Sequence, residues 1–208
     1  MGKRLTSILI LPLATSLVAC AGWGALTTKD LVPEETVERV KAQKAAANVT
    51  PAQRAVFGIL ADFPGHTFRG EPTGDNPVNV ADVQRWEWTD NGEALLIRHA
   101  LEDGSYGGDT IVRPGEKDGR LAYVYDTNTG FSTEGTFSIS DDGTWEAVED
   151  VVGQSDVTKV RSRGHRRADG ALISSSDYFK DGEWVAGHGF VYKEVDQDLP
   201  ELKTPVPK

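Results

Sequence analysis

The amino-acid sequence predicts an all-β protein, an antiparallel up-and-down β-barrel of about eight to ten strands with one or two helices before it. First, residues 66–193 consist of short runs rich in Val, Ile, Thr, Tyr, Phe and Trp, as is typical of strands. Second, Asx-Gly steps such as Asp103-Gly104 and Asp181-Gly182 separate these runs and favour tight hairpins. Third, no helix-forming segment interrupts the series, so consecutive hairpins are the simplest topology, and closing them removes exposed edges.

Residues 1–19 predict a signal peptide. Lys3 and Arg4 give the chain a basic start, and Leu5 to Ala19 is mostly apolar and carries no charge. This run is shorter than the roughly 20 residues that a membrane-spanning helix needs. A basic start followed by a short apolar run and small residues is typical of a cleaved targeting segment.

The run ends in Leu17-Val18-Ala19-Cys20, which resembles the lipobox of bacterial lipoproteins. The resemblance implies that the chain is cleaved before Cys20 and that Cys20 is lipidated. Its acyl chains would then hold the protein on a membrane, with a free energy of about 0.8 kcal/mol for each buried methylene. Ala21, rather than Asp, implies the periplasmic face of the outer membrane in the sorting pattern that this motif resembles. The alternatives are an ordinary signal peptide and an uncleaved signal anchor. Cys20 is the only cysteine, so no disulfide framework is expected.

Residues 20–50 are predicted to form a lipidated tether and a marginal helix. The tether contains Gly and Thr without periodicity, and residues 34–47 are rich in Ala, Glu, Lys and Gln but carry only a thin apolar stripe.

A second helix start follows at Thr50. Thr50 is a suitable N-cap, Pro51 suits the first helical position, and Gln53 completes a capping-box pattern. The helix is strongly apolar, through Val56, Phe57, Ile59 and Leu60. We therefore expect it to pack on the domain that follows.

That domain, residues 51–195 with the helix included, contains ten candidate strands. They are expected at 66–71, 83–89, 94–101, 107–113, 120–125, 131–139, 143–149, 157–166, 171–179 and 183–193. Residues 196–208 are polar, contain three prolines and are expected to form a flexible tail.

Two segments carry a family resemblance. Gly65-His66-Thr67-Phe68-Arg69-Gly70-Glu71 resembles the first strand of lipocalin-like (calycin) barrels, and Arg85-Trp86-Glu87-Trp88 with the Asp181-Gly182-Glu183-Trp184 hairpin looks like small bacterial lipocalin-like domains of unknown function. The resemblance implies an up-and-down barrel that holds one small, mostly apolar ligand. It implies no catalytic residue.

Strand alternation places aromatic side chains on common faces. Trp86 and Trp88 share a face, as do Tyr123 and Tyr125, and simple alternation puts Trp184, His188 and Phe190 together. The interior is either hollow and holds a flat hydrophobic ligand, or filled by its own side chains, as in many small barrels. The candidate ligand-binding residues are Trp86, Trp88, His99, Tyr123, Tyr125, Trp184, His188 and Phe190.

Other chemistry has little support in the sequence. His188 is either a haem ligand, as in haem-binding barrels, or a hydrogen-bonded structural histidine, and no His pair has metal-ligand spacing.

Arg161, Arg163 and His165 alternate on one strand and form either an anion site or a solvated face paired with acids. Ser174-Ser175-Ser176 lacks the glycines of a nucleophile elbow. We predict no catalytic residue, no metal and no cofactor.

The formal charge is −10, and removal of Lys3 and Arg4 with the signal peptide leaves −12. So acidic a chain lacks the basic footprint of a general nucleic-acid binder. Two functions remain: a lipid-anchored barrel that binds a small hydrophobic ligand, or a non-catalytic interaction lipoprotein with a packed barrel. An enzyme is the third and least supported reading, and a cavity with converging titratable groups would favour it.

Overall fold

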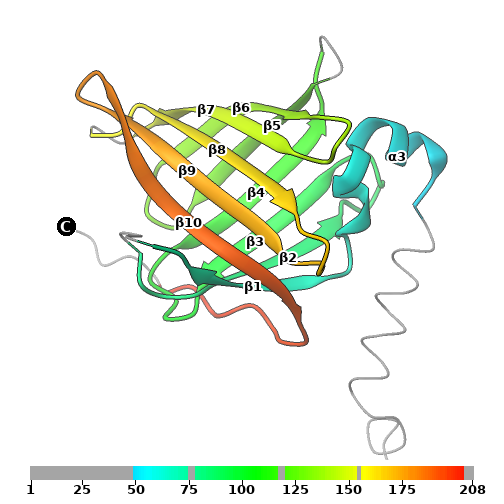
Figure 1. Cartoon of the computed structure of the whole chain (residues 1–208), viewed down its shortest axis with the longest axis horizontal. Coiled ribbons are helices and arrows are strands. Elements are labelled where there is room, and N and C mark those ends of the chain that lie inside the picture. The colour runs from blue at the N-terminus through cyan, green and yellow to red at the C-terminus, as the bar shows by residue number, and fades with distance from the viewer. Residues whose placement is uncertain (1–48, 75–77, 117–119, 154–155, 204–208) are drawn as a thin grey trace, which may run out of the picture. The chain divides into compact units, whose positions relative to one another are not determined.

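The computed structural model describes residues 49–74, 78–116, 120–153 and 156–203. Within these ranges, helix α3 (Pro51–Phe57) and the 3-10 helix η1 (Gly58–Asp62) precede ten strands that close into one antiparallel barrel (Figure 1). The predicted fold class is therefore confirmed. The strands are β1 (Thr67–Pro72), β2 (Asp82–Trp88), β3 (Leu95–Leu101), β4 (Gly107–Pro114), β5 (Leu121–Thr127), β6 (Ser132–Ile139), β7 (Trp145–Val152), β8 (Lys159–Arg166), β9 (Leu172–Lys180) and β10 (Glu183–Val195).

The barrel closes through β1, which pairs with β2 on one side and with β10 on the other. Thr67 lies opposite Arg85 of β2 and opposite Val195 of β10. From β2 to β10, consecutive strands pair in chain order, as a meander requires. Each strand that the structure describes thus has two neighbours, and none presents an unpaired edge.

All ten predicted strands are present, with ends that differ from the predicted ones by about three residues at most. The predicted hairpin turns have the expected backbone. Asp181 and Gly182 both have positive φ, 53° and 86°, in the two-residue turn between β9 and β10. The predicted turn at Lys117-Asp118-Gly119 lies outside the described residues.

Strand β10 contains a β-bulge between Ala186 and Gly189. Ala186 lies opposite Asp177, whereas Gly189 lies opposite Ser175, so β10 has one residue more than β9 over this stretch. An extra residue reverses the alternation of side chains on the two sides of the bulge. Even-numbered residues of β10 therefore face outward before the bulge and into the barrel after it.

Helices α3 and η1 lie over the end of the barrel where β2 ends and β3 begins (Figure 1). The predicted capping box is present, because the Thr50 hydroxyl accepts from Gln53 N at 3.1 Å and the Gln53 side chain accepts from Thr50 N at 2.8 Å. Gln53 also donates to the carbonyl of Gly92 in the β2–β3 turn at 2.8 Å. The buried side chains of Phe57 and Leu60 join the core, so the apolar helix packs on the barrel as expected.

The predicted signal peptide (1–19), Cys20, the tether and the helix at 34–47 lie outside the described residues. Of the predicted tail, residues 196–203 are described, and 204–208 are not. The Lys203 N–H donates to the Gly104 carbonyl at 2.9 Å, and the Asn128 side chain donates to the Lys203 carbonyl at 3.3 Å. This part of the tail is thus held against the β3–β4 and β5–β6 turns.

Candidate functional site

A cavity of about 230 Å³ lies inside the barrel. Strands β2 to β10 all contribute lining residues, and Leu60 of η1 and Phe63 line it beside them. The volume is below the roughly 300–1,000 Å³ of typical ligand pockets but above the roughly 150 Å³ that suffices for benzene. The barrel of the described residues is therefore not completely filled by its own side chains.

One part of the cavity wall is apolar and aromatic. The Phe63 ring packs edge-on against Trp86, with centroids 5.0 Å apart. The Tyr123 and Phe137 rings lie 4.6 Å apart, and Phe137 contacts Trp145 at 5.8 Å. The remaining apolar lining residues are Leu60, Val78, Ile97, Leu101, Ala147, Leu172, Ile173 and Phe190.

A second part of the wall is a chain of hydrogen bonds that begins at Asp82. His99 Nδ1 lies 2.8 Å from Asp82 Oδ1, and His99 Nε2 lies 2.7 Å from the Tyr125 hydroxyl. The Tyr125 hydroxyl donates to the Tyr106 hydroxyl at 2.9 Å. With Tyr125 donating in that direction, both ring nitrogens of His99 act as donors, which is the hydrogen bonding of a protonated imidazole.

The second oxygen of Asp82 is also occupied. It accepts from the Tyr192 hydroxyl at 2.8 Å and from the Gln84 amide at 3.2 Å. The Asp82 side chain is only 4% exposed, so these partners replace the water that the carboxylate loses on folding.

The pKa values of Asp82 and His99 move apart. Burial acts to raise the pKa of Asp82, but the charge of His99 and the hydrogen bonds from His99, Tyr192 and Gln84 together lower it. Burial acts to lower the pKa of His99, but the charge and hydrogen bond of Asp82 together raise it. The two groups therefore form a buried ion pair in the cavity wall.

Glu149 of β7 is a second carboxyl in the wall, and it is half-buried. It accepts hydrogen bonds from the hydroxyls of Thr133 and Tyr123. Burial raises the pKa of Glu149, and these two hydrogen bonds only partly offset that effect. Among the residues that the structure describes, no Lys, Arg or His side chain forms an ion pair with Glu149.

His188 of β10 is held as a neutral imidazole. Its Nδ1 lies 2.5 Å from the Tyr178 hydroxyl. Burial lowers the pKa of His188 to about 4, and the nearby His99 charge acts in the same direction. Of the two interpretations that the sequence left open for this residue, the contacts show the hydrogen-bonded one; haem binding stays untested.

Glycines make room for the aromatic rings of the wall. A Cβ at Gly70 of β1 would lie 2.5 Å from the Tyr192 ring, and one at Gly164 of β8 would lie 2.2 Å from the Trp145 ring. A Cβ at Gly108 of β4 would come within 2.8 Å of the Tyr125 ring. Aromatic rings thus cover glycines on other strands, which positions the ring without filling the cavity.

The structure brings together six of the eight predicted ligand-binding residues. The cavity is lined by Trp86, His99, Tyr123, Tyr125, His188 and Phe190. Trp88 shares the inner face with Trp86, but it lies under the helix, where its ring packs against Phe57 at 5.2 Å. Whether any of these residues binds a ligand stays a prediction.

Trp184 lies on the outer face, which corrects the expectation that it shares a face with His188. The bulge in β10 separates the two residues and reverses the alternation. Trp184 pairs with Phe179, and the guanidinium of Arg161 lies 4.7 Å from its ring centroid. The residue is 40% exposed.

Sequence reasoning missed several polar lining residues. Asp82 and Gln84 lie on the same face of β2 as Trp86, and Glu149 lies on the same face of β7 as Trp145. Extending the same period-two pattern beyond the aromatic residues identifies them. Tyr106 lies in a loop, where no strand pattern indicates its direction.

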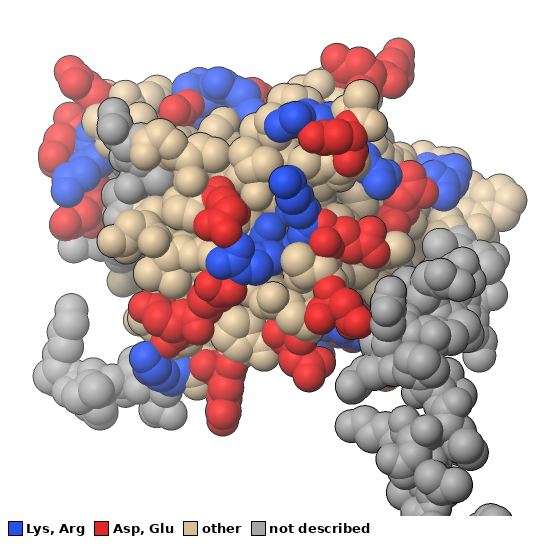
Figure 2. Space-filling view, turned by 60° about the horizontal axis from the view of Figure 1, so that its bottom comes forward, with Lys and Arg blue, Asp and Glu red and all other residues tan. Residues whose placement is uncertain are grey.

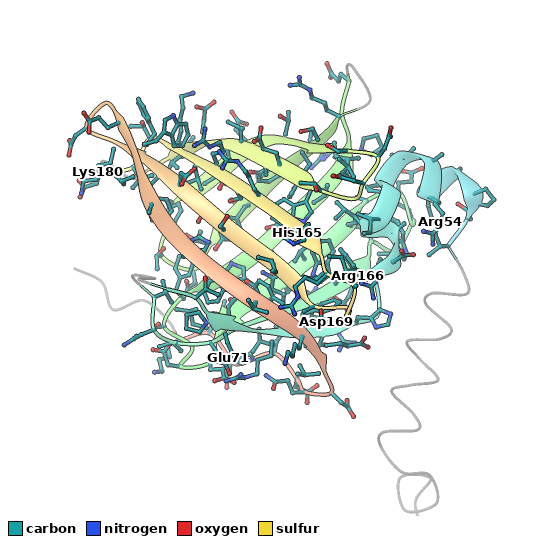
Figure 3. All side chains as sticks on the ribbon, in the orientation of Figure 1. Arg54, Glu71, His165, Arg166, Asp169 and Lys180 are labelled. Atoms are coloured by element: carbon teal, nitrogen blue, oxygen red, sulfur yellow. The ribbon has the colours of Figure 1, made fainter. Side chains whose placement is uncertain are left out.

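The outer surface carries paired charges. Arg161 lies 2.6 Å from Asp177, and Arg163 lies 3.2 Å from Glu146, so these arginines form a solvated face with acidic partners. On the face shown in Figure 2, basic side chains lie between acidic ones. Figure 3 shows Arg54 on α3 and Lys180 at the other end of the barrel.

Among the described residues, no three His, Cys, Asp or Glu side chains are grouped closely enough to hold a metal ion. The described part of the chain also contains no helix with the length and hydropathy needed to cross a membrane. Comparison with protein-family models and with curated proteins finds no match to this chain.

Proposed function

We propose that this protein is a lipid-anchored barrel of the cell envelope that binds one small, mostly apolar molecule in its interior. The observation that carries the proposal is the cavity of about 230 Å³, which has aromatic side chains on one part of its wall and a few oriented polar groups on another. Ligand sites commonly combine an apolar lining with a small number of placed polar groups.

An unpaired donor adds support. The indole N–H of Trp86 is buried and has no hydrogen-bond acceptor among the described residues. An unsatisfied buried donor costs about 1–3 kcal/mol. Because Trp86 lines the cavity, a bound molecule is one source of the missing acceptor.

Anchoring and location rest on the first twenty-one residues. The Leu17-Val18-Ala19-Cys20 segment resembles a lipobox, and Ala21 favours the outer membrane. We propose that acyl chains on Cys20 hold the barrel at the periplasmic face of that membrane.

The binding proposal is tested by native mass spectrometry of the full chain, purified gently from its own cells. A discrete added mass on the wild-type protein supports it. Ala147 is 3% exposed and lines the cavity, so Ala147→Phe fills part of the space, and we expect the added mass to be lost. Val148→Phe is the matched control, because Val148 lies on the outer side of the same strand and is 41% exposed.

A bare mass for the wild-type protein, together with no binding of an apolar dye, would count against the proposal. The alternative function would then be favoured, which is a non-catalytic interaction lipoprotein that acts through its surface.

A second candidate, acid–base catalysis on the bound molecule, has one specific observation in its favour. Titratable groups converge in the cavity, where the Asp82–His99 pair continues through Tyr125 to Tyr106. Recovery of the captured molecule in chemically altered form after incubation with the protein would favour this candidate over simple binding.

A further inference from the structure

The two carboxyls of the cavity wall, the buried Asp82 and the half-buried Glu149, differ in how their charge is balanced. Asp82 is paired with His99 and accepts from two further side chains. Glu149 accepts from two neutral hydroxyls, and no cationic side chain among the described residues pairs with it. A buried carboxylate without a cation is energetically unfavourable, and a partner of opposite charge relieves that cost.

The strand register directs Glu149 toward the cavity next to an aromatic residue. Tyr123, Gly135 and Glu149 lie side by side on β5, β6 and β7. Gly135 has no side chain, so the Tyr123 hydroxyl reaches across it to the Glu149 carboxyl. Ala147, the inward neighbour of Glu149 on β7, is small and leaves space in the cavity.

Aromatic rings continue from this carboxyl along the same wall. Tyr123 contacts Phe137, and Phe137 contacts Trp145, with centroid separations of 4.6 and 5.8 Å. All three rings line the cavity together with Glu149. The face of an aromatic ring attracts a cation through its quadrupole, more strongly where water is excluded.

We propose that the ligand of the cavity carries a protonated amine, which forms an ion pair with Glu149 beside the rings of Tyr123, Phe137 and Trp145. This inference rests on the binding function proposed above and names its ligand class. The Asp82–His99 pair is balanced within the wall, and the tyrosines that continue from it, Tyr125 and Tyr106, present neutral hydroxyls. The apolar part of the ligand packs against apolar lining residues such as Trp86 and Leu172.

The direction of the Glu149 pKa agrees with this proposal. Burial raises the pKa of the Glu149 carboxyl, so its negative charge is poorly compensated by the protein. A bound ammonium group would supply the missing charge and lower that pKa.

Three probes of one shape and different charge test the proposal: 2-phenylethylamine, 2-phenylethanol and phenylacetate. Each has a single ring and a short arm, which suits a cavity larger than that needed for benzene. Binding to the full chain in detergent micelles is measured by isothermal titration calorimetry. We expect the wild-type protein to bind the amine about tenfold or more tightly than the alcohol, and the carboxylate least, because charge-assisted hydrogen bonds are the stronger ones.

Glu149→Gln keeps the size of the side chain and removes its charge. We expect it to lose the preference for the amine while still binding the alcohol. Glu146→Gln is the matched control, because Glu146 lies on the outer face of the same strand, where it pairs with Arg163. It should keep the wild-type preference.

The outcomes separate the two proposals. Equal binding of amine and alcohol by the wild-type protein, or a preference that survives Glu149→Gln, overturns the amine inference but leaves the binding function standing. If none of the three probes binds the wild-type protein, both proposals fail for molecules of this size. The wild-type comparison decides the matter even if Glu149→Gln does not fold.

Discussion

At the scale of the residue, His188 links the cavity to the pH dependence of folding. The side chain is neutral in the barrel, because burial lowers its pKa to about 4. In the unfolded chain a histidine takes up a proton near pH 6.5. Between about pH 6.5 and pH 4 the unfolded chain therefore binds a proton at this histidine that the folded protein does not bind. The folding stability that His188 provides is fully present above about pH 6.5 and is lost as the pH falls toward 4.

We therefore expect the wild-type protein to lose up to about 2 kcal/mol of stability through His188 between pH 7.5 and pH 5. His188→Gln retains a partner for Tyr178 and does not titrate, so it should lack this loss. Urea unfolding of both proteins at the two pH values gives the difference. The raised pKa values of His99 and Glu149 act in the opposite direction, which is why the comparison with the variant is needed.

His165→Gln provides the control for this measurement. His165 is exposed at the end of β8 and lies outside the cavity, so its replacement controls for the removal of a histidine that does not line the cavity. An unchanged pH dependence in His188→Gln would contradict the assignment of the buried neutral histidine.

At the scale of the element, α3 depends on its cap. The helix has only seven residues, so its free-standing stability is low, and the Thr50 hydroxyl satisfies one of its unpaired N–H groups. Thr50→Ala should lower the free energy of unfolding by about 1 kcal/mol, whereas Thr50→Ser keeps the oxygen and should cost much less. Chemical denaturation followed by Trp fluorescence measures both, and equal losses in the two variants would argue against the cap.

The bulge in β10 has a different role at this scale. It directs His188, Phe190 and Tyr192 into the cavity while Trp184 stacks outside under Arg161. A regular strand of the same sequence would bring Trp184 to the inner face. One extra residue thus determines which aromatic side chains line the cavity.

At the scale of the whole molecule, the barrel and its proposed anchor are separate features. Lipidation requires the thiol of Cys20, which is the only cysteine in the chain. In Cys20→Ser we expect no lipid on the N-terminal peptide and release of the protein from the membrane fraction. Mass spectrometry of that peptide and fractionation of the cells measure the two effects, and a membrane-bound Cys20→Ser protein would contradict the lipid anchor.

The closed barrel also explains why the cavity exists. Its circumference is determined by the number and stagger of its strands. Glycines such as Gly70 and Gly164 accept the rings of Tyr192 and Trp145 against the wall, so these large side chains do not extend across the interior. The space that remains lies between these rings and the side chains of Phe63 and Leu60.

The sequence by itself determined the local features of this protein. Alternating side chains and Asx-Gly turns are properties of a few neighbouring residues, so the strands, the hairpins and the Thr50 cap could be read directly from them. The same alternation identified most of the aromatic wall, including His99 and Tyr123.

Only the tertiary structure decided what depends on residues far apart in the chain. The extra residue in β10 is visible only against the register of β9, so the position of Trp184 could not be read from its own strand. The pairing of Asp82 with His99 depends on strands that meet in the barrel, and so does the lack of a cationic partner for Glu149 among the described residues. Whether the interior is hollow likewise depends on how rings and glycines of different strands share the space inside the barrel, because packing is a property of the whole set of side chains.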